Sequence, residues 1–209
     1  MPTLLRLDCS PRGRNAHSWR FADELTQRLQ LATPGTSVIH RALFDAPPAY
    51  VDEAFSKVMT THTTPELARE TPALTLSEKL IVELETSDML LIASPVHNFT
   101  VPAPLKAWLD QVVRFGRTFR STPEGKIGLL RDRPTWIVLS SGGYFTQGKV
   151  RQPEFAAPYL QAILGCMGIR DVTVLRLEGL SRGDEAAAAT WATARQELDR
   201  RFGLASAAG

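Results

Sequence analysis

The stretch that most constrains the fold of this chain is residues 89–93, which read MLLIA and stop at Ser94-Pro95. A strand with one face in water alternates apolar and polar residues, whereas this run is apolar throughout. Such a run is typical of a strand covered on both faces, as in a parallel sheet packed between helices. It therefore predicts an α/β architecture, in which helices lie on both sides of a sheet.

Strands and helices alternate along the rest of the chain. The residue patterns predict further strands at 3–9, 37–43, 135–139 and 172–177, and helices at 18–31, 76–85, 105–113, 155–167 and 184–202. This alternation predicts one parallel sheet with right-handed crossovers. Five such units match the flavodoxin-like, doubly wound sheet, with strand order 2-1-3-4-5 and helices on both faces. The dinucleotide-binding order is disfavoured, because the loop after the first strand has a single glycine, Gly13, and no G-x-G-x-x-G.

Length, charge and cysteine usage exclude several classes of protein. The 209 residues suit one core and contain no linker, so we expect one domain over residues 1–202 and a disordered tail at 203–209. The 24 basic and 22 acidic residues are interspersed, which argues against a nucleic-acid or membrane partner. With two distant cysteines, no signal peptide and no long apolar run, a cytoplasmic location is predicted. No metal site is expected, since His62 and Glu66 lack a third ligand nearby.

In open parallel sheets, ligands bind beyond the carboxyl ends of the strands, so three loops are candidates for a binding site. The first, SPRGRNAHS at residues 10–18, precedes a helix and is rich in hydroxyl, amide and guanidinium groups. Free N–H groups at a helix N-terminus favour an anion, above all a phosphate, although an ordinary capped loop is an equal alternative. The third, at residues 140–143, contains Gly142-Gly143 and lets backbone approach a ligand, although alone it could be a plain turn.

The second loop, PVHNFTVP at residues 95–102, is the most informative. Asn98 offers a planar donor and acceptor, and Phe99 offers a flat apolar face. Pro95 and Pro102 stiffen the backbone around them. A phosphate pocket beside a planar, amide-lined slot is what flavin mononucleotide (FMN) needs, so the three loops together predict an FMN site.

The segment SPVHNFTVPAPLKAWLDQVVRFGRTF, residues 94–119, resembles the signature of FMN-dependent NADH-azoreductases, which are also quinone reductases. The resemblance extends over nearly the whole chain, since the loops at 10–18 and 140–143 stand at matching places. It implies that the phosphate is held by Ser10, Ala16, His17 and Ser18. It implies that the isoalloxazine ring and the ribityl arm are held by Val96, His97, Asn98, Phe99, Ser140, Ser141, Gly142 and Gly143.

The same resemblance implies an enzyme with one non-covalently bound FMN per subunit and with NADH, or NADPH, as the electron donor. Quinones and aromatic azo compounds would be its acceptors. It also implies a homodimer with active sites at the interface, where the long connection at residues 44–74 would help to roof them. Residues 50–59 of that connection are expected to be helical.

Four positions depart from the family pattern. His97 stands where the family usually has tyrosine, and Ala16 stands where a serine is common. Ser121 and Cys166 occupy positions at which an aromatic residue often walls the substrate pocket. These departures leave the preferred acceptor open.

The three loops offer no general acid or nucleophile except His97, so the flavin is expected to carry the chemistry. Hydride would pass from the nicotinamide to the flavin, and the acceptor would then occupy the same slot, which gives a ping-pong order. His97 could donate a proton, or it could be a wall of the pocket. The catalytic residues are therefore left unassigned.

Other functions fit parts of the sequence. A flavodoxin-type electron carrier shares the fold, but such carriers are typically acidic and lack a long roof segment; a cofactor-free binding module is a further alternative. The G-x-S-x-G pattern at residues 179–183 suggests a hydrolase, yet every histidine precedes Ser181, against the order Ser, acid, His of that fold. Ser181 is therefore interpreted as a turn or cap residue, and Cys9 as a buried core residue.

Overall fold

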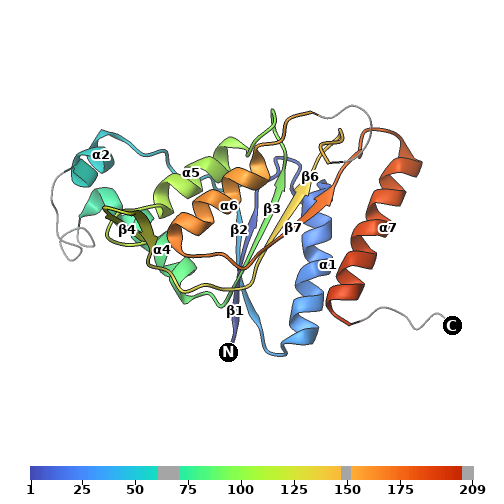
Figure 1. Ribbon diagram of the computed structural model, residues 1–209, viewed down its shortest axis with the longest axis horizontal. Helices are drawn as coiled ribbons and strands as arrows, with labels where there is room; N and C mark the ends of the chain where they lie inside the picture. Colours follow the sequence, from blue (N-terminus) through green and yellow to red (C-terminus); the bar gives the residue numbers. More distant parts are fainter. Residues whose placement is uncertain (61–70, 147–151, 204–209) are drawn as a thin grey trace.

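A computed structural model of the protein describes residues 1–60, 71–146 and 152–203. Its centre is a parallel sheet built from β1 (Thr3–Asp8), β2 (Ser37–Ala42), β3 (Met89–Pro95), β6 (Thr135–Ser140) and β7 (Val172–Leu177). The strands lie side by side in the order β2-β1-β3-β6-β7 (Figure 1). Counted within this sheet alone, they follow the order 2-1-3-4-5. The labels differ because the chain adds a separate hairpin between β3 and β6.

Helices cover both faces of the sheet (Figure 1). On one side lie α1 (His17–Ala32) and α7 (Asp184–Arg201), and on the other lie α4 (Thr75–Thr86), α5 (Ala103–Val112) and α6 (Ala156–Met167). Side chains of β3 alternate between the two resulting cores, because successive side chains of a strand point to opposite faces. Leu90 and Ile92 pack in one core, and Leu91 packs in the other. The apolar run at residues 89–93 is therefore buried on both faces, as predicted, with side chains at most 8% exposed.

Two segments differ from the sequence prediction. The hairpin of β4 (Phe119–Thr122) and β5 (Gly125–Gly128) was not predicted, since its strands are short and mostly exposed and carry no apolar alternation. In the long connection, α2 (Glu53–Thr60) begins three residues later than the expected helix at 50–59. A side-chain oxygen of Asp52 accepts a hydrogen bond from the N–H of Phe55 at 2.8 Å and so caps the helix at that point. His62, Glu66 and residues 204–209 of the tail lie outside the described residues.

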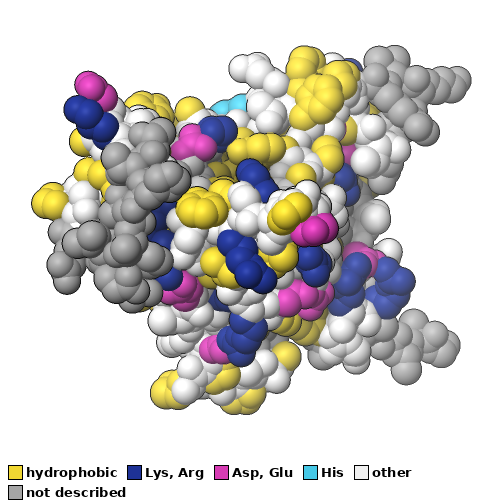
Figure 2. Space-filling model, turned by 60° about the vertical axis from the view of Figure 1, so that its left-hand side comes forward, with side chains coloured by type: hydrophobic (Ala, Val, Ile, Leu, Met, Phe, Trp, Pro, Cys, Tyr) yellow, Lys and Arg dark blue, Asp and Glu magenta, His cyan; other side chains and the backbone are white. Residues whose placement is uncertain are grey.

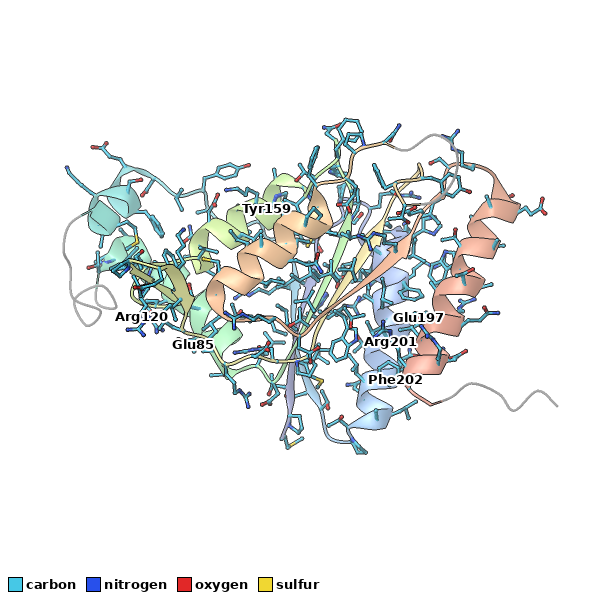
Figure 3. All side chains as sticks on the ribbon, viewed as in Figure 1. Glu85, Arg120, Tyr159, Glu197, Arg201 and Phe202 are labelled. Carbon is cyan, nitrogen blue, oxygen red and sulfur yellow. The ribbon has the colours of Figure 1, made fainter. Side chains whose placement is uncertain are left out.

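The second half of the segment at residues 94–119 stabilises the packing of helices and does not form the ligand-binding edge of the sheet. Arg114 follows α5, is 1% exposed and forms an ion pair with Glu78 of α4. Arg117 reaches Glu85 at 2.9 Å. Glu85, labelled in Figure 3, lies near the end of the same helix. The hydroxyl of Thr118 donates to the carbonyl of Val112 at 2.7 Å and closes the turn after α5. These contacts hold α5 to α4, and so fix the helix that follows the loop at residues 95–102.

The surface carries charges of both signs. On the face shown in Figure 2, basic and acidic side chains are interleaved with hydrophobic ones. In the described part of the chain, the helices lack the combination of length and apolar character that crossing a bilayer requires.

Candidate functional site

A cavity of about 160 Å³ opens at the carboxyl ends of β1, β3 and β6. The loops after β1, β6 and β7 and the end of β3 line it. None of the described residues that line the cavity is acidic, whereas Arg12 is basic. Hydroxyl groups come from Ser10, Ser140, Ser141 and Ser181. The cavity lies at the edge where open parallel sheets bind ligands, and its lining suits an anion.

The loop after β1 leads into an open helix N-terminus. The short 3-10 turn η1 (Gly13–Asn15) precedes α1, which begins at His17 without a side chain that caps it. The first N–H groups of a helix lack acceptors within the helix and carry the positive end of its dipole. Ser10 is 6% exposed, and its Oγ accepts a hydrogen bond from the N–H of Arg12 at 3.2 Å. Ser10 and His17 line the same cavity, so a ligand there meets both the hydroxyl and the helix N-terminus.

Ser18 contributes an unsatisfied hydroxyl at the same helix N-terminus. It is the second residue of α1 and is fully buried. Its Oγ has no hydrogen-bond partner among the described residues. A buried hydroxyl left unpaired costs about 1–3 kcal/mol. An acceptor bound at the N-terminus of α1 could relieve that cost.

The loop after β6 is clamped by the loop after β7. Backbone hydrogen bonds of 2.9 to 3.2 Å join the two loops: Gly179 N to Gly143 O, Leu180 N to Ser141 O, and Ser181 N to Gly142 O. These bonds use the carbonyl groups of the β6 loop, and the N–H of Ser141 donates to the carbonyl of Leu177 at 2.9 Å. Among the described residues, the N–H groups of Gly142 and Gly143 are therefore the ones left for a ligand. A Cβ atom on Gly142 would lie 2.5 Å from Oγ and 3.1 Å from Cβ of Ser181, so a larger residue here would displace the Ser181 side chain.

Glu178 fixes the continuation of the same loop. It is 5% exposed, and its carboxylate accepts hydrogen bonds from the N–H groups of Phe145 and Thr146 and from the hydroxyl of Thr146, all at 3.1 Å. Gly179, at φ 76°, passes against Tyr144, whose Cζ would be 2.4 Å from a Cβ at that position. The segment from Ser141 to Thr146 is thus held by residues 178–181.

The loop after β3 has a strained backbone. Asn98 and Phe99 adopt left-handed conformations, with φ 46° and 71°, and are the two non-glycine residues with positive φ in the described chain. Paired hydrogen bonds between His97 and Thr100, both 2.9 Å, close the turn. The N–H of Phe155, next to α6, donates to the carbonyl of Phe99 at 2.7 Å. Strain of this kind persists where the surroundings hold it, often at ligand sites.

Two ionisable groups near the site have shifted pKa values. Burial, together with the guanidinium groups of Arg12 and Arg20, lowers the pKa of His17 from its ordinary value. Burial, reinforced by the negative charge of Asp8, raises the pKa of the Cys9 thiol. Cys9 is wholly buried in the core, as predicted, and its thiol stays protonated near neutral pH. Among the described residues, no group of three His, Cys, Asp or Glu side chains could hold a metal ion.

The structure brings together part of the site set predicted from the sequence. The cavity is lined by Ser10, Ala16, His17, Val96, Ser140, Ser141 and Gly142. It does not include Ser18, His97, Asn98, Phe99 or Gly143, which lie beyond its lining. Nor does it include Ser121, in β4, or Cys166, in α6.

Four lining residues were not predicted: Arg12, Pro95, Leu180 and Ser181. Ser181 was interpreted as a turn or cap residue, and it does lie in a turn, but that turn packs against Gly142. The available signal was the Gly-Leu-Ser-Arg-Gly loop after the last strand of the sheet, since all such loops meet at one edge.

Comparison with known proteins gives consistent matches over the whole fold. A family model described as a flavodoxin-like fold matches residues 2–202. The FMN-dependent NADH:quinone oxidoreductase 4 of Pseudomonas fluorescens is 43% identical over 198 residues, which cover 95% of this chain and 94% of that protein. The FMN-dependent NADH:quinone oxidoreductase 2 of Cupriavidus pinatubonensis is 44% identical over 185 residues, covering 88% and 90%.

Solved structures share the fold at lower identity. An azoreductase from Bacillus anthracis superposes with a TM-score of 0.81 at 23% identity, over 97% of this chain and 99% of that one. An FMN-dependent NADH-azoreductase from the same species, solved in complex with FMN, superposes with a TM-score of 0.76 at 22% identity, over 97% of this chain and 100% of that one.

Proposed function

The chain belongs to the family of FMN-dependent NADH:quinone oxidoreductases, within the flavodoxin-like fold, and we propose on that premise that it binds FMN and catalyses the same class of reaction. NADH, or NADPH, would be the electron donor. Quinones would be reduced by two electrons, and aromatic azo compounds would be cleaved to amines.

The observation that carries this proposal is the anion site at the N-terminus of α1. The uncapped helix and the buried hydroxyl of Ser10 fit the phosphate group of FMN, and the unpaired Oγ of Ser18 lies at the same helix N-terminus, just outside the lining of the cavity. Ala16 and His17 lie at the same N-terminus. The absence of acidic groups from the described lining of the cavity supports an anionic ligand.

The remaining predicted ligands would hold the rest of the cofactor. The cavity of about 160 Å³ is smaller than the roughly 300–1,000 Å³ that drug-sized ligands occupy, so it suits the phosphate and part of the ribityl arm. The isoalloxazine ring would extend over Val96, His97, Asn98 and Phe99, with Ser140, Ser141, Gly142 and Gly143 beside it. When bound, FMN supplies the hydride chemistry that the side chains lack. The N–H groups of the glycine loop would orient the ring and favour negative charge on it.

No side chain is assigned as the catalytic residue. His97 lies at the left-handed turn, where it could donate a proton to an acceptor or form a wall of the slot. The family relationship favours an enzyme over the alternative of a flavodoxin-type electron carrier, because the matched relatives are named for their oxidoreductase activity. We also propose a single flavin-binding domain over residues 1–202, supported by the extent of the family match, and a cytoplasmic location, supported by the free Cys9 and Cys166.

The proposed activity predicts a ping-pong rate law. Protein loaded with FMN should oxidise NADH over many turnovers only when a quinone is present, and double-reciprocal plots for NADH at several quinone concentrations should be parallel. The reason is that donor and acceptor would use one slot in turn. Apoprotein freed of FMN is the matched control and should be inactive. Intersecting lines would show a ternary complex, and NADH oxidation that does not depend on FMN would contradict the proposal as a whole.

A homodimer is also proposed, because the slot needs a cover that the described chain does not supply. Exposed aromatic side chains are Phe99 (42%), in the loop after β3, Phe155 (56%), next to α6, Phe115 (61%), after α5, and Tyr50 (75%), before α2. The hydrogen bond between Phe155 and Phe99 places two of them together. Clustered exposed apolar groups are typical of an interaction surface. We expect the partner subunit to cover them and the flavin ring.

Sedimentation velocity at micromolar concentration should therefore give about twice the chain mass of 23.0 kDa. Replacing both Phe115 and Phe155 with serine should shift the protein toward monomer, because it removes two exposed rings from the proposed interface. Replacing the exposed Leu31, which lies at the end of α1, is the matched control and should leave the dimer intact. A monomer with full activity would rule out the dimer.

A further inference from the structure

His17, at the edge of the cavity, receives a hydrogen bond from a distant part of the chain. Nε1–H of Trp191, in α7, donates to Nδ1 of His17 at 3.0 Å. The two rings are 6.0 Å apart between centroids and inclined at 51°. An indole N–H can only donate, so Nδ1 of His17 must be the acceptor and must carry no proton. The neutral imidazole then carries its single proton on Nε2.

Trp191 is itself held firmly. Its side chain is 8% exposed and packs in the core between α1, α7 and the sheet. The ring of Phe21 meets it edge-on at 5.5 Å. The guanidinium groups of Arg20 and Arg195 lie over the indole at 5.3 and 5.0 Å, and Arg195 is paired with Glu24. The donor that fixes His17 therefore has little freedom to move.

The remaining ring nitrogen of His17 is the one available to the cavity. His17 lines the cavity together with Ser10 and Arg12. Because Nδ1 is occupied by Trp191, Nε2–H is the polar group of the ring that a ligand there can meet. We propose that Trp191 is a positioning residue for the anion site: it locks His17 in the tautomer and orientation in which Nε2–H donates a hydrogen bond to the phosphate of FMN. This inference rests on the proposed function, which supplies the phosphate.

The surrounding charges keep His17 neutral. Arg12, from the loop after β1, and Arg20, from α1, are the charged groups that act on the ring, and both lower its pKa, after burial. From α7, the facing groups are Trp191 and, over the indole, Arg195. No described carboxylate forms a hydrogen bond with His17. Protonation would also place a second N–H on Nδ1 against the N–H of Trp191. His17 thus acts as a neutral donor at pH values where a free histidine would titrate.

The substitution Trp191→Phe tests this role, because it keeps an aromatic ring and removes the N–H. The neutral ring of His17 then loses the hydrogen bond that fixes its tautomer and orientation. FMN affinity at pH 8 should therefore fall about fivefold, which is equivalent to one ordinary hydrogen bond. Nδ1 becomes free to accept a proton, so the pKa of His17 should rise. At pH 6 the imidazolium would attract the phosphate, and the affinity ratio of variant to unaltered protein should return to about one. Using the ratio cancels the titration of the phosphate itself, which occurs near pH 6.

Three controls separate positioning from general damage. Trp136→Phe changes a second tryptophan, which is partly buried against the same core, and should leave the affinity for FMN unchanged. Riboflavin lacks the phosphate, so Trp191→Phe should not weaken its binding. In a His17→Gln background, Trp191→Phe should have no further effect on FMN affinity, as expected when one residue acts through another.

Nitrogen-15 NMR of the imidazole in the apoprotein gives a readout that needs no FMN. The unaltered protein should show Nε2 protonated and Nδ1 unprotonated at pH 8, and Trp191→Phe should show a mixture of tautomers. Suppose that FMN binds, but that the ratio of FMN affinities of Trp191→Phe and the unaltered protein is independent of pH and the pKa of His17 does not change. The positioning role is then overturned and the proposed function stands. If the unaltered protein does not bind FMN, the proposed function fails, and with it the phosphate as the ligand of His17.

Discussion

Protein carrying Ser10→Asp is expected to purify folded and almost free of FMN. The new carboxylate would lie at the site proposed for the phosphate dianion. At a separation of about 4 Å and an effective dielectric of about 20, two unit charges interact by about 4 kcal/mol. Repulsion of this size lowers the affinity at least about 100-fold, since about 1.4 kcal/mol corresponds to a tenfold change. Titration of the apoprotein with FMN, followed by flavin fluorescence, measures the effect.

The fold should survive this substitution, because aspartate can replace the local contact of Ser10. The serine Oγ accepts a hydrogen bond from the N–H of Arg12, and a carboxylate oxygen can accept the same bond. Ser10→Ala is the matched control: it removes one hydrogen bond to a charged group and should weaken FMN about tenfold. Riboflavin should bind Ser10→Asp about as well as it binds the unaltered protein. FMN occupancy equal to that of the unaltered protein would exclude the phosphate from this site.

The central strands were predictable because a strand that is buried on both faces has an uninterrupted run of apolar residues in its sequence. Residues 89–93 have no polar position, and the structure places their side chains alternately in two cores. Helix ends were also readable where one residue type decides them. Gly168 ends α6 in the left-handed conformation at φ 105°, which other residues adopt only at a cost.

The hairpin β4–β5 could not be predicted in this way. Its strands are short and mostly exposed, without a run of apolar residues, and what fixes the hairpin is contact with the end of α6, about 40 residues later in the chain. Sequence periodicity reports only the environment of a residue within its own element. A contact between two backbone segments that are far apart in sequence is invisible to it.

The binding site likewise contains residues that the sequence predicts and residues that it does not. Ser10 and His17 could be found because they bound the loop after β1, and Ser140 because it ends β6; all strands of a parallel sheet end at one edge. Ser181 was missed because the G-x-S-x-G pattern of its loop is typical of hydrolases and was judged only as such. The contact between Trp191 and His17 could not be predicted, since Trp191 lies on an inward face of α7 where packing alone explains a tryptophan.

The second large effect is expected at Gly128, where the hairpin meets α6. A Cβ atom on this residue would lie 2.1 Å from the backbone nitrogen of Gly168 and 2.4 Å from its Cα, far below the 3.0 Å that real Cβ atoms keep. Gly168 cannot retreat easily, because its own N–H closes the last turn of α6 and the N–H of Leu130 holds Met167 at 3.0 Å. Gly128→Ala should therefore lower the free energy of unfolding by about 3 kcal/mol, at the upper end of ordinary overpacking.

For a chain of this length, that loss corresponds to a fall in Tm of about 6–12 °C. Gly165→Ala is the matched control, because it adds the same methyl group within α6 at a position with no atom within 4 Å. Alanine removes the entropic cost of a helical glycine, so this variant should gain about 0.5–1 kcal/mol. Opposite shifts from the same chemical change would show that the close backbone contact, and not the loss of glycine, decides the outcome. If Gly128→Ala unfolds at the same denaturant concentration as the unaltered protein, the hairpin does not depend on this contact.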